Sequence, residues 1–504
     1  SAVPDYRHSA NWGLADNGGH IKILDNNGVE IDKIGYGSAD SPESSAFIVD
    51  FSASGSLERK AIATSTVASI TSGSDKWQGN GYDSNNNAND FILRASANPQ
   101  NSASPFEPRS DEPILPGVVN DLTVQYAYTS SNSIKLIWAV PATANVADGA
   151  YYDLRYMASS AGCNLQLNWD SAIMVASSSL PAPASAAAEQ TATVGGLAVN
   201  TTYCFAIRVF NGQFWSDISN NVQAKTLTSQ TQLTTLQYDW ASNIVTQTLT
   251  PDKNPYYINW SFAIQDGSVL TIPPGVIIKF SPPYYMSGGV IPVTLFVNGQ
   301  IKAQGTSRNP VVFTSIYDDT YAGDSNGDGG ATMPVAGNWG GMQINSSGNI
   351  FDYVVMKHGG ADARGLMTFY SNENNVISNS IFSHHTAGIE FRSSSSSDPT
   401  VISYSDFSNF SKSAFATFSD ANPNIIYNNI HDNQIGIIVR DQSVPTINYN
   451  NIYNNIDFGV EHSYYLLEPN INARLNWWGH ESGPTYSTNP SGQGDNSPEI
   501  EHGD

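Results

Sequence analysis

The residues best suited to chemistry are oxygen-bearing side chains that alternate in a short segment beyond the middle of the chain. Asp324, Asn326 and Asp328 occupy every second position and are followed by Gly329. Alternating oxygen ligands with a glycine at the turn allow a short loop to wrap around a hard cation such as Ca²⁺. The segment therefore predicts a calcium site, and the alternative is a solvated turn that holds no ion.

The remaining ligands of this loop are less certain in the sequence. An EF-hand loop carries a bidentate Glu at its twelfth position, which here is Val335, so the loop is not an EF-hand. Asp318 or Asp319, just upstream, could supply the missing carboxylate. A calcium ion held in this way would be structural, because it would pin a long excursion of the chain against the body of its domain.

A second acidic, amide-rich loop runs from Asp83 to Asp90 and contains several asparagines. Asparagine-rich turns usually bond their own backbone. A self-satisfied turn is therefore the preferred interpretation of this loop, and a calcium site is the alternative.

Carboxylates on the later part of the chain could carry acid–base catalysis. The candidates are Asp406, Asp432 and Glu390. Two carboxylates about 5–9.5 Å apart can hydrolyse a glycosidic bond, and parallel strands lie about 4.8 Å apart, so Asp406 could lie above Asp432. The alternative, polar residues on the rim of a repeating structure, is preferred because the sequence has no pectinase or lyase signature. The other polar candidates on the same units are Arg392, Arg440, Asp441, His384, His385, His431 and His462.

The elements that must position these residues repeat along the chain. From Asn374 onward, four units of similar pattern each end on a proline, and these prolines are 24, 22 and 24 residues apart. A fixed period of this length indicates stacked supersecondary units. Short β-branched and aromatic runs predict strands within each unit, so the pattern predicts a right-handed parallel β-helix over residues 238–504, with paired asparagines stacked inside it. The prolines are Pro399, Pro423, Pro445 and Pro469, and an apolar position recurs at Ile381, Phe407, Ile430 and Ile452.

The end of the repeat region adds aromatic candidates. Residues 475–495, which include Trp477 and Trp478, resemble the terminal coil of secreted right-handed β-helix proteins. We expect at least one of these tryptophans to cap the last coil, because the open end of a solenoid must be shielded. Tyr284 and Tyr285 fall in an expected loop and would suit contact with protein or glycan.

Two further modules precede the repeat region, at residues 1–98 and 118–226, with linkers at 99–117 and 227–237. In the first module, alternation across Asn26–Gly28 predicts a β-hairpin. Segments 56–60, 86–91 and 99–102 resemble the lamin-tail domain of secreted prokaryotic proteins, which implies an immunoglobulin-like β-sandwich. The opening strands of that family have no counterpart, so a strand from a neighbouring molecule could complete the sandwich and build a homopolymer.

Residues 118–226 resemble a fibronectin type III domain, with Leu197 and Tyr203 where that family has its corner leucine and tyrosine. The resemblance implies a second sandwich with Trp138 in its core. Alternation turns Tyr203 toward the core and Cys204 away from it. We therefore expect a surface disulfide between Cys204 and Cys163, and two free buried thiols are the alternative.

Composition limits the partners and the location. The net charge is −23 with only 22 Lys and Arg, which excludes a nucleic-acid-binding protein and favours cation binding. No apolar run of about 18 residues predicts a membrane span. The chain starts at Ser1 without Met or a signal peptide, so we expect a processed protein. Low charge and abundant Asn, Ser, Thr and Gly are typical of extracellular or cell-surface β proteins.

Two functions fit these features. The preferred one is a non-enzymatic, calcium-stabilised adhesive or filament-forming protein outside the cell, with a glycan or surface protein as its partner. The second is a secreted polysaccharide hydrolase or lyase, in which the solenoid is catalytic and the two sandwiches are accessory modules. The first is preferred because catalysis needs titratable groups clustered in one groove, and the sequence alone does not show such a cluster.

Overall fold

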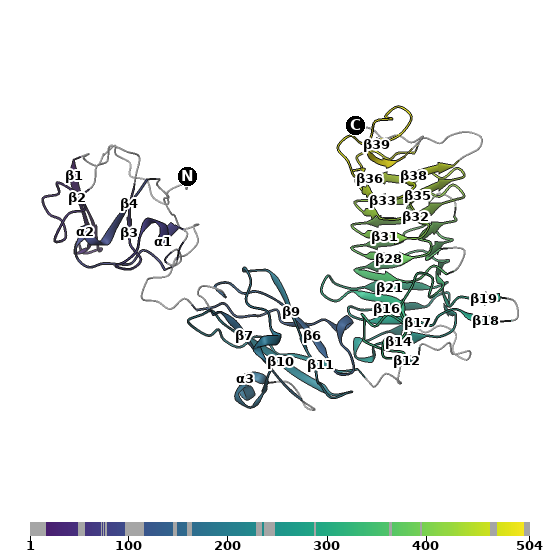
Figure 1. Cartoon of the computed structure of the whole chain (residues 1–504), viewed down its shortest axis with the longest axis horizontal. Helices are drawn as coiled ribbons and strands as arrows, with labels where there is room; N and C mark the ends of the chain where they lie inside the picture. Colours follow the sequence, from purple (N-terminus) through teal and green to yellow (C-terminus); the bar gives the residue numbers. More distant parts are fainter. Residues whose placement is uncertain are drawn as a thin grey trace.

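The computed structural model has two antiparallel β modules followed by a long parallel solenoid, which confirms the predicted all-β fold (Figure 1). None of the helices in the described part of the chain is long and apolar enough to cross a membrane. These helices are α1 (Val67–Thr71), α2 (Asn87–Asp90), α3 (Leu165–Asn168), η1 (Tyr126–Tyr128), η2 (Trp169–Ser171), η3 (Ser177–Ser179) and η4 (Pro251–Lys253). The described residues are 17–48, 56–71, 73, 75, 78–95, 115–144, 149–158, 164–227, 234–235, 247–286, 289–361, 365–393, 396–463 and 471–497.

The first module consists of two separate two-stranded sheets. Strand β1 (Gly18–Leu24) pairs with β2 (Glu30–Gly37), and β3 (Ser56–Arg59) pairs with β4 (Phe91–Arg94). The predicted hairpin is confirmed, and Asp25 Oδ1 closes its turn by accepting the Val29 amide at 2.7 Å. The completion of this module by a neighbouring strand stays a prediction, because its expected donor, residues 1–8, lies outside the described residues.

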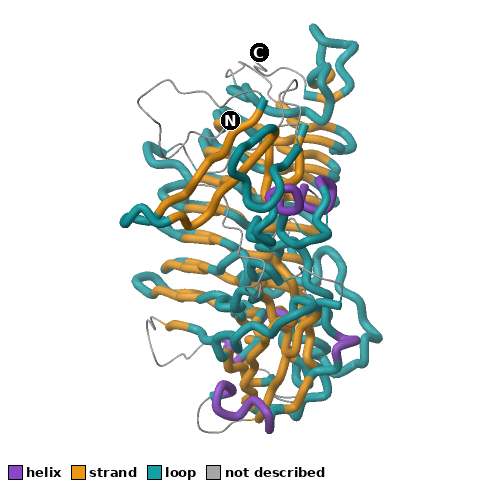
Figure 2. The backbone as a smooth tube through the Cα atoms, turned by 90° about the vertical axis from the view of Figure 1, so that its left-hand side faces the viewer, coloured by secondary structure: helices purple, strands orange, loops and turns teal. Residues whose placement is uncertain are grey.

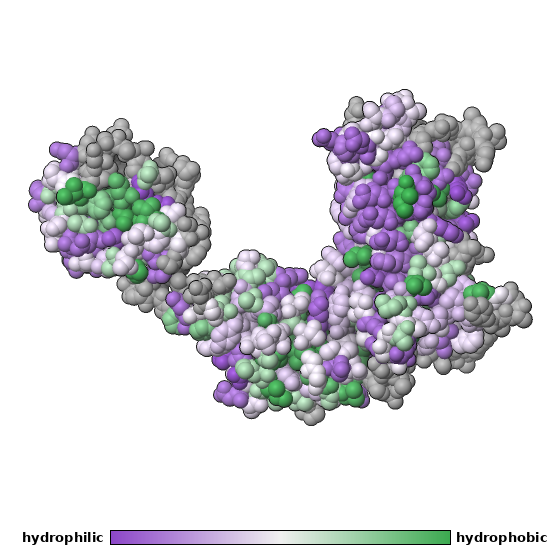
Figure 3. Space-filling model, viewed as in Figure 1, coloured by the Kyte–Doolittle hydropathy of each residue, from purple (hydrophilic) through white to green (hydrophobic). Residues whose placement is uncertain are grey.

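Apolar side chains gather on one face of the first module (Figure 3). On the β1–β2 hairpin, Ile23, Val29 and Ile31 are each more than half exposed. The hairpin therefore has little of the burial that normally stabilises two isolated strands.

The second module is a sandwich of a four-stranded and a three-stranded antiparallel sheet. Trp138 and Phe205 are fully buried between the sheets, and the Tyr203 hydroxyl accepts the Ala198 amide at 2.9 Å. This bond joins the two residues of the predicted corner, Tyr203 and the segment after Leu197. The strands are β11 (Val222–Lys225), β10 (Thr202–Phe210), β7 (Tyr151–Ala158) and β8 (Ile173–Met174) in one sheet, and β5 (Thr123–Val124), β6 (Ile134–Ala139) and β9 (Glu189–Val194) in the other.

Cys204 lies on the opposite side of strand β10 from the sandwich core, as alternation predicts. It is fully buried rather than on the surface, because Leu165 and Trp169 of the α3–η2 segment cover it. Cys163 lies outside the described residues, so the disulfide stays a prediction.

The solenoid has three parallel sheets, and most coils add one strand to each, so that the strands stack along its axis (Figure 2). The nine-stranded sheet consists of β12 (Thr234–Thr235), β14 (Tyr256–Ile258), β17 (Ile277–Phe280), β22 (Val311–Ser315), β25 (Val354–Lys357), β28 (Ile381–His385), β31 (Asp406–Phe410), β34 (Asn429–His431) and β37 (Asn451–Tyr453). The second sheet consists of β13 (Gln247–Thr248), β16 (Val269–Ile272), β21 (Gln300–Gln304), β24 (Ile350–Asp352), β27 (Val376–Ser378), β30 (Val401–Ser403), β33 (Asn424–Ile426) and β36 (Thr446–Asn448). The third sheet consists of β15 (Phe262–Ile264), β20 (Thr294–Val297), β23 (Gly341–Ile344), β26 (Met367–Phe369), β29 (Ile389–Phe391), β32 (Ser413–Thr417), β35 (Ile435–Arg440) and β38 (Phe458–Ser463).

The strand register corrects one predicted core position. Phe407, Ile430 and Ile452 are fully buried, but the residue that stacks with them in the preceding coil is Phe382, not Ile381. Ile381 is 45% exposed and pairs with Asp406. Side chains alternate between the two faces of a strand, so a register shift of one residue exchanges the inside for the outside.

Asparagines stack inside the turns, as predicted. Asn428 Nδ2 donates to Asn450 Oδ1 at 3.1 Å, and Asn450 Nδ2 donates to Asn476 Oδ1 at 3.1 Å. Asn428 and Asn450 are both 1% exposed. Each amide therefore satisfies buried groups of the neighbouring coil, which water cannot reach.

The last coil is closed by a tryptophan and a short strand pair, β39 (Pro484–Thr485) with β40 (Gly494–Asn496). Trp478 belongs to the continuous apolar core of the solenoid and is 4% exposed, whereas Trp477 is 48% exposed. The expected cap is therefore Trp478. A second short pair, β18 (Tyr284–Met286) with β19 (Gly289–Ile291), is a hairpin that leaves the early coils.

Replacement of Asn450 by Ala is predicted to lower the free energy of unfolding by about 2–3 kcal/mol, because each buried polar group left unpaired costs about 1–3 kcal/mol. The neighbouring variant Asn451→Ala is a matched control, since Asn451 is exposed and donates only to Asn429, at 2.8 Å. It should change stability by less than about 0.5 kcal/mol. Urea unfolding curves of the two variants measure the difference, and equal shifts would show that the internal stack does not stabilise the coils.

Candidate functional site

The outer face of the nine-stranded sheet changes from apolar to polar along the solenoid. Its early positions, such as Val312, are buried, whereas later ones, such as Asn429, are exposed and polar. All of them occupy the same register position, so they form one straight row. In chain order the row is Ile277, Val312, Val355, Ile381, Asp406, Asn429 and Asn451.

The second module covers the apolar part of this row. Ala127 and Leu227 pack in one cluster with Ile277, Val312 and other early residues of the sheet, which explains why these outward side chains are buried. The later coils have no such cover among the described residues of the cluster. The accessible face of the sheet therefore begins near Ile381.

Polar contacts fix the second module against the solenoid. Arg308, in the loop before β22, donates to Asp121 Oδ2 at 2.8 Å and to Glu189 Oε1 at 2.7 Å. The next residue, Asn309, accepts the Tyr126 amide at 2.9 Å. The module is therefore anchored as a wall at one end of the accessible face.

Two of the predicted catalytic carboxylates meet on this face through a histidine. His431 Nε2 lies 3.0 Å from Asp406 Oδ2, and His431 Nδ1 lies 2.6 Å from Asp432 Oδ2. The Tyr453 ring of the next coil stacks on the imidazole with centroids 4.8 Å apart and an interplanar angle of 5°. Asp406, His431 and Asp432 are named the carboxylate–imidazole cluster below.

The carboxylates also set the charge of the histidine. Partial burial by itself would lower the pKa of His431, but the hydrogen bonds with Asp432 and Asp406 outweigh it, so the pKa is raised above its ordinary value of 6.5. Only a protonated imidazole can donate to both carboxylates at once. The cluster can therefore hold a proton between two carboxylates on a partly exposed surface.

The sequence placed Asp406 and Asp432 in the right neighbourhood but in the wrong relation. Asp406 stacks on Asn429 in the sheet, while Asp432 lies in the turn after β34 with φ of 54°. The third candidate, Glu390, is on β29 of another sheet, 9% exposed, and accepts from Arg392 Nε at 2.8 Å. The structure therefore does not bring Glu390 together with the other two.

Three exposed tyrosines stack beside this cluster and are named the tyrosine ladder below. The Tyr404 and Tyr427 rings are 5.2 Å apart at 3°, and the Tyr427 and Tyr449 rings are 4.9 Å apart at 10°. Their exposures are 63%, 44% and 48%. Each tyrosine lies two residues before a residue of the polar row, so the rings run parallel to that row.

The backbone of the ladder is in an unusual conformation for tyrosine. Tyr404, Tyr427 and Tyr449 have φ of 51°, 58° and 61°, in the left-handed region that disfavours residues other than Gly, Asn and Asp. The equivalent position in the preceding coil is Asn379, with φ of 50°, which suits this turn better. Tyrosine is therefore not required by the turn, and an unfavourable residue kept at an exposed position indicates a role for its side chain.

The sequence analysis missed the tyrosine ladder, although the signal was present. Tyr404, Tyr427 and Tyr449 are 23 and 22 residues apart, the same spacing as the strands that follow them. The asparagines directly after Tyr427 and Tyr449 drew attention to the interior of the solenoid instead.

The predicted calcium loop lies between β22 and β23, and the structure gathers three of its five candidate residues. Carboxylate oxygens of Asp319, Asp324 and Asp328 lie within 4.8 Å of one another. Asp324 and Asp328 also accept backbone amides, for example from Gly327 at 2.7 Å. Asp318 is turned away, 2% exposed, and accepts the Thr314 hydroxyl at 2.7 Å.

Two oxygens of this loop are buried without a hydrogen-bond partner in the described part of the chain, namely Asp319 Oδ1 and Asn326 Oδ1. Burial and the nearby charge of Asp324 raise the pKa of Asp319. Carboxylate and amide oxygens are the donors that Ca²⁺ prefers. Asp319, Asp324, Asn326 and Asp328 therefore fit a calcium ion, which would supply only structural support here.

A lysine beneath the loop already neutralises part of this charge. Lys279 is fully buried, and its Nζ donates to Asp318 O at 2.8 Å, Gly323 O at 3.1 Å and Ser325 Oγ at 2.7 Å. Burial lowers the pKa of Lys279 to about 8, against the opposing influence of the nearby aspartates. The base of the loop is thus anchored without a metal ion.

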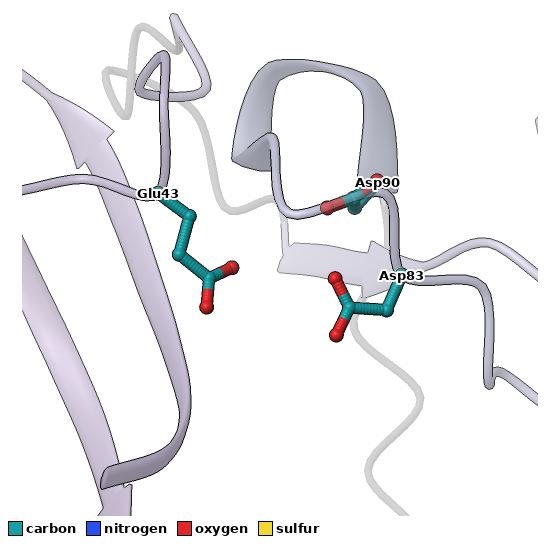
Figure 4. A group of neighbouring side chains, drawn as sticks. All are labelled: Glu43, Asp83 and Asp90. Carbon is teal, nitrogen blue, oxygen red and sulfur yellow. The ribbon is translucent and has the colours of Figure 1, made fainter.

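The second acidic loop gathers Glu43, Asp83 and Asp90, which point toward one another in Figure 4. Asp90 accepts the Ser84 amide at 3.0 Å and its hydroxyl at 2.6 Å, so much of its hydrogen-bonding capacity is used within the loop. Burial, Asp32 and Asp83 raise the pKa of Glu43, a residue from a distant segment that the sequence did not indicate. The geometry favours the self-satisfied turn.

Comparisons of sequence support the solenoid. Residues 330–465 match a family described as "Right handed beta helix region", and residues 242–362 match one described as "Pectate-lyase like beta helix domain". The chain thus contains a right-handed β-helix region, as predicted. No curated protein matches the chain. The resemblance of the two preceding modules to lamin-tail and fibronectin type III domains stays a prediction.

Solved structures with distant similarity include two polysaccharide-degrading enzymes. A family 28 exopolygalacturonase from Yersinia enterocolitica is 13% identical, with 68% of this chain and 75% of that chain covered and a TM-score of 0.25. A pectate lyase from Pectobacterium carotovorum is 12% identical, with 72% and 91% covered and a TM-score of 0.24. A sensor domain of an anti-sigma factor from Pseudobacteroides cellulosolvens is 20% identical over 21% of this chain and 94% of that chain, with a TM-score of 0.15.

Asp319→Asn is predicted to separate the two interpretations of the calcium loop by opposite signs. If the loop binds Ca²⁺, EDTA lowers the melting temperature of the wild type, and the variant in calcium is less stable than the wild type. If the loop holds no ion, EDTA has no effect and the variant is more stable in both buffers, because one of three repelling carboxylates is gone. Differential scanning calorimetry in calcium and in EDTA measures this, with Asp420→Asn, an exposed carboxylate outside the loop, as the control.

Proposed function

We propose that this protein is an extracellular polysaccharide-binding protein, and that it holds an extended glycan chain along the later coils of the nine-stranded sheet. The observation that carries the proposal is the tyrosine ladder with the polar row beside it. Similarity of residues 242–362 to a pectate-lyase-like family is in keeping with this function.

The ladder has the chemistry that a sugar chain requires. A pyranose ring presents C–H groups that pack on an aromatic face and hydroxyls that need hydrogen-bond partners. Tyr427 and Tyr449 offer the faces, and Asn429 and Asn451 offer exposed amides next to them. Because each coil repeats this pair, the surface suits a linear polymer whose units also repeat.

The same face supports a second candidate function, glycoside hydrolysis. The specific observation is that Asp406 and Asp432 lie on either side of His431. His431, as an imidazolium, would give its proton to the glycosidic oxygen, and the more exposed Asp432 would take a proton from the attacking water. The bond between the anomeric carbon and the glycosidic oxygen breaks as the water oxygen bonds to that carbon.

The adhesive function expected from the sequence is compatible with polysaccharide binding, whereas assembly into a homopolymer rests on the first module alone. The geometry of the later coils therefore shifts the preference from a filament protein toward a protein that acts on polysaccharide.

Tyr427→Ala is predicted to weaken polysaccharide binding about tenfold, because loss of an aromatic contact worth about 1.4 kcal/mol has this effect on affinity. Tyr370→Ala is the matched control, since Tyr370 is 38% exposed on another sheet of the solenoid. Affinity electrophoresis in gels that contain soluble plant and bacterial polysaccharides measures both. Retardation that is equally reduced in the two variants, or absent for every polymer in the wild type, would contradict the proposal.

Hydrolysis, if it occurs, is predicted to fall as the pH rises through the raised pKa of His431. The protonated histidine is the donor, so the activity is fully present below that pKa and is lost above it. Release of reducing ends, measured from pH 5 to pH 9, gives the profile. Asp406→Asn removes one partner that raises the pKa and should move the descending limb to lower pH. A limb that does not move would exclude His431 as the donor.

A further inference from the structure

We infer that the polymer recognised on this face is uncharged, that is, a glycan without carboxylate or sulfate groups. The inference rests on the proposed function and adds the class of ligand. It follows from the charges that line the later coils.

The outward positions of the later strands carry acidic but no basic side chains. Within strands β28, β31, β34 and β37 and the turn after β34, all of which are described, two carboxylates face outward and no Lys or Arg does. His431 can offset one negative charge only, and it is already bonded to both carboxylates. The outward residues are Ile381, Ser383, Asp406, Ser408, Asn429, His431, Asp432, Asn451 and Tyr453.

The nearest cations are committed elsewhere. Lys357, one coil before Ile381, has its ammonium 5.8 Å from the centre of the Tyr321 ring, at the end of the face that the second module covers. Arg392 lies on another sheet and bonds Glu390. Lys279 is buried beneath the calcium loop.

An anionic polymer would meet unfavourable charges along its whole length on this face. Recognition of a carboxylate or sulfate normally uses arginine forks or lysines, and none lies within reach of the ladder on these strands. The net charge of −23 adds a longer-range repulsion, which is screened over about 10 Å at 0.1 M salt.

A neutral glycan, by contrast, finds a partner for each kind of group it has. The ring faces meet Tyr404, Tyr427 and Tyr449, and the hydroxyls can donate to Asp406 or accept from Asn429. Hydroxyl donors to carboxylates form the stronger, charge-assisted class of hydrogen bond. The acidic groups therefore favour neutral sugars while they exclude acidic ones.

Matched polymers that differ only in charge test the inference. Binding is measured by affinity electrophoresis with hydroxyethyl cellulose against carboxymethyl cellulose, and with highly methyl-esterified against de-esterified homogalacturonan, in low salt with either calcium or EDTA. We expect at least one neutral member to bind ten times or more tightly than its anionic counterpart. Added salt should narrow this difference, because it screens repulsion.

Charge-removing variants locate the effect. Asp406→Asn should strengthen binding of the anionic member several-fold relative to the neutral one, whereas Asp420→Asn, an exposed carboxylate at another corner of the solenoid, should not. Tighter binding of an anionic member, with or without calcium, overturns the inference but leaves the polysaccharide-binding function intact. If no polymer of either charge binds, the proposed function itself fails and the inference fails with it.

Discussion

Parallel pairing between successive coils is the constraint on which the rest of the solenoid depends. Every strand must present its backbone groups to the strands before and after it, about 4.8 Å away. The pairing holds Ile377, Ile402, Ile425 and Ile447 in one buried line, even though the intervals between them differ. Residues at equal register must therefore stack, whatever their chemistry. Buried phenylalanines, internal asparagines and exposed tyrosines all form rows for this one reason.

The same constraint creates ends and faces that other parts of the chain must cover. Trp478 closes the last coil, and the second module covers the apolar start of the outer row, where Arg308 holds it in place. Covered and accessible stretches of one sheet thus have different compositions. The apolar row stops where the second module stops, and the polar residues and tyrosines begin there, so structural and binding roles are divided along the axis.

The fold was largely predictable from the sequence, because a period of 22–24 residues with β-rich units leaves few architectures. Positions within a coil were less predictable. Ile381 was assigned to the core because apolar character alone does not distinguish it from Phe382, and only pairing with Asp406 shows which one faces outward. Contacts between distant segments, such as Glu43 with the Asp83–Asp90 loop, leave no local pattern at all.

The candidate site shows the same limit. Asp406 and Asp432 could be named from their residue type, but their connection through His431 depends on a turn with positive φ that places Asp432 beside the ring. The acidic loop was recognisable from its alternation, whereas the choice of Asp319 over Asp318 was not. Which of two adjacent carboxylates faces a loop depends on tertiary contacts, here the bond of Asp318 with Thr314.

The repeating turn of the tyrosine ladder has an evolutionary consequence. Because each ring is supplied by one coil, duplication of a coil would lengthen the aromatic track by one ring and about 4.8 Å without moving the rings already present. Loss of a coil would shorten it by the same step. The track therefore behaves as a ruler whose length is counted in coils, and related solenoids of different coil number would be fitted to glycan segments of different length.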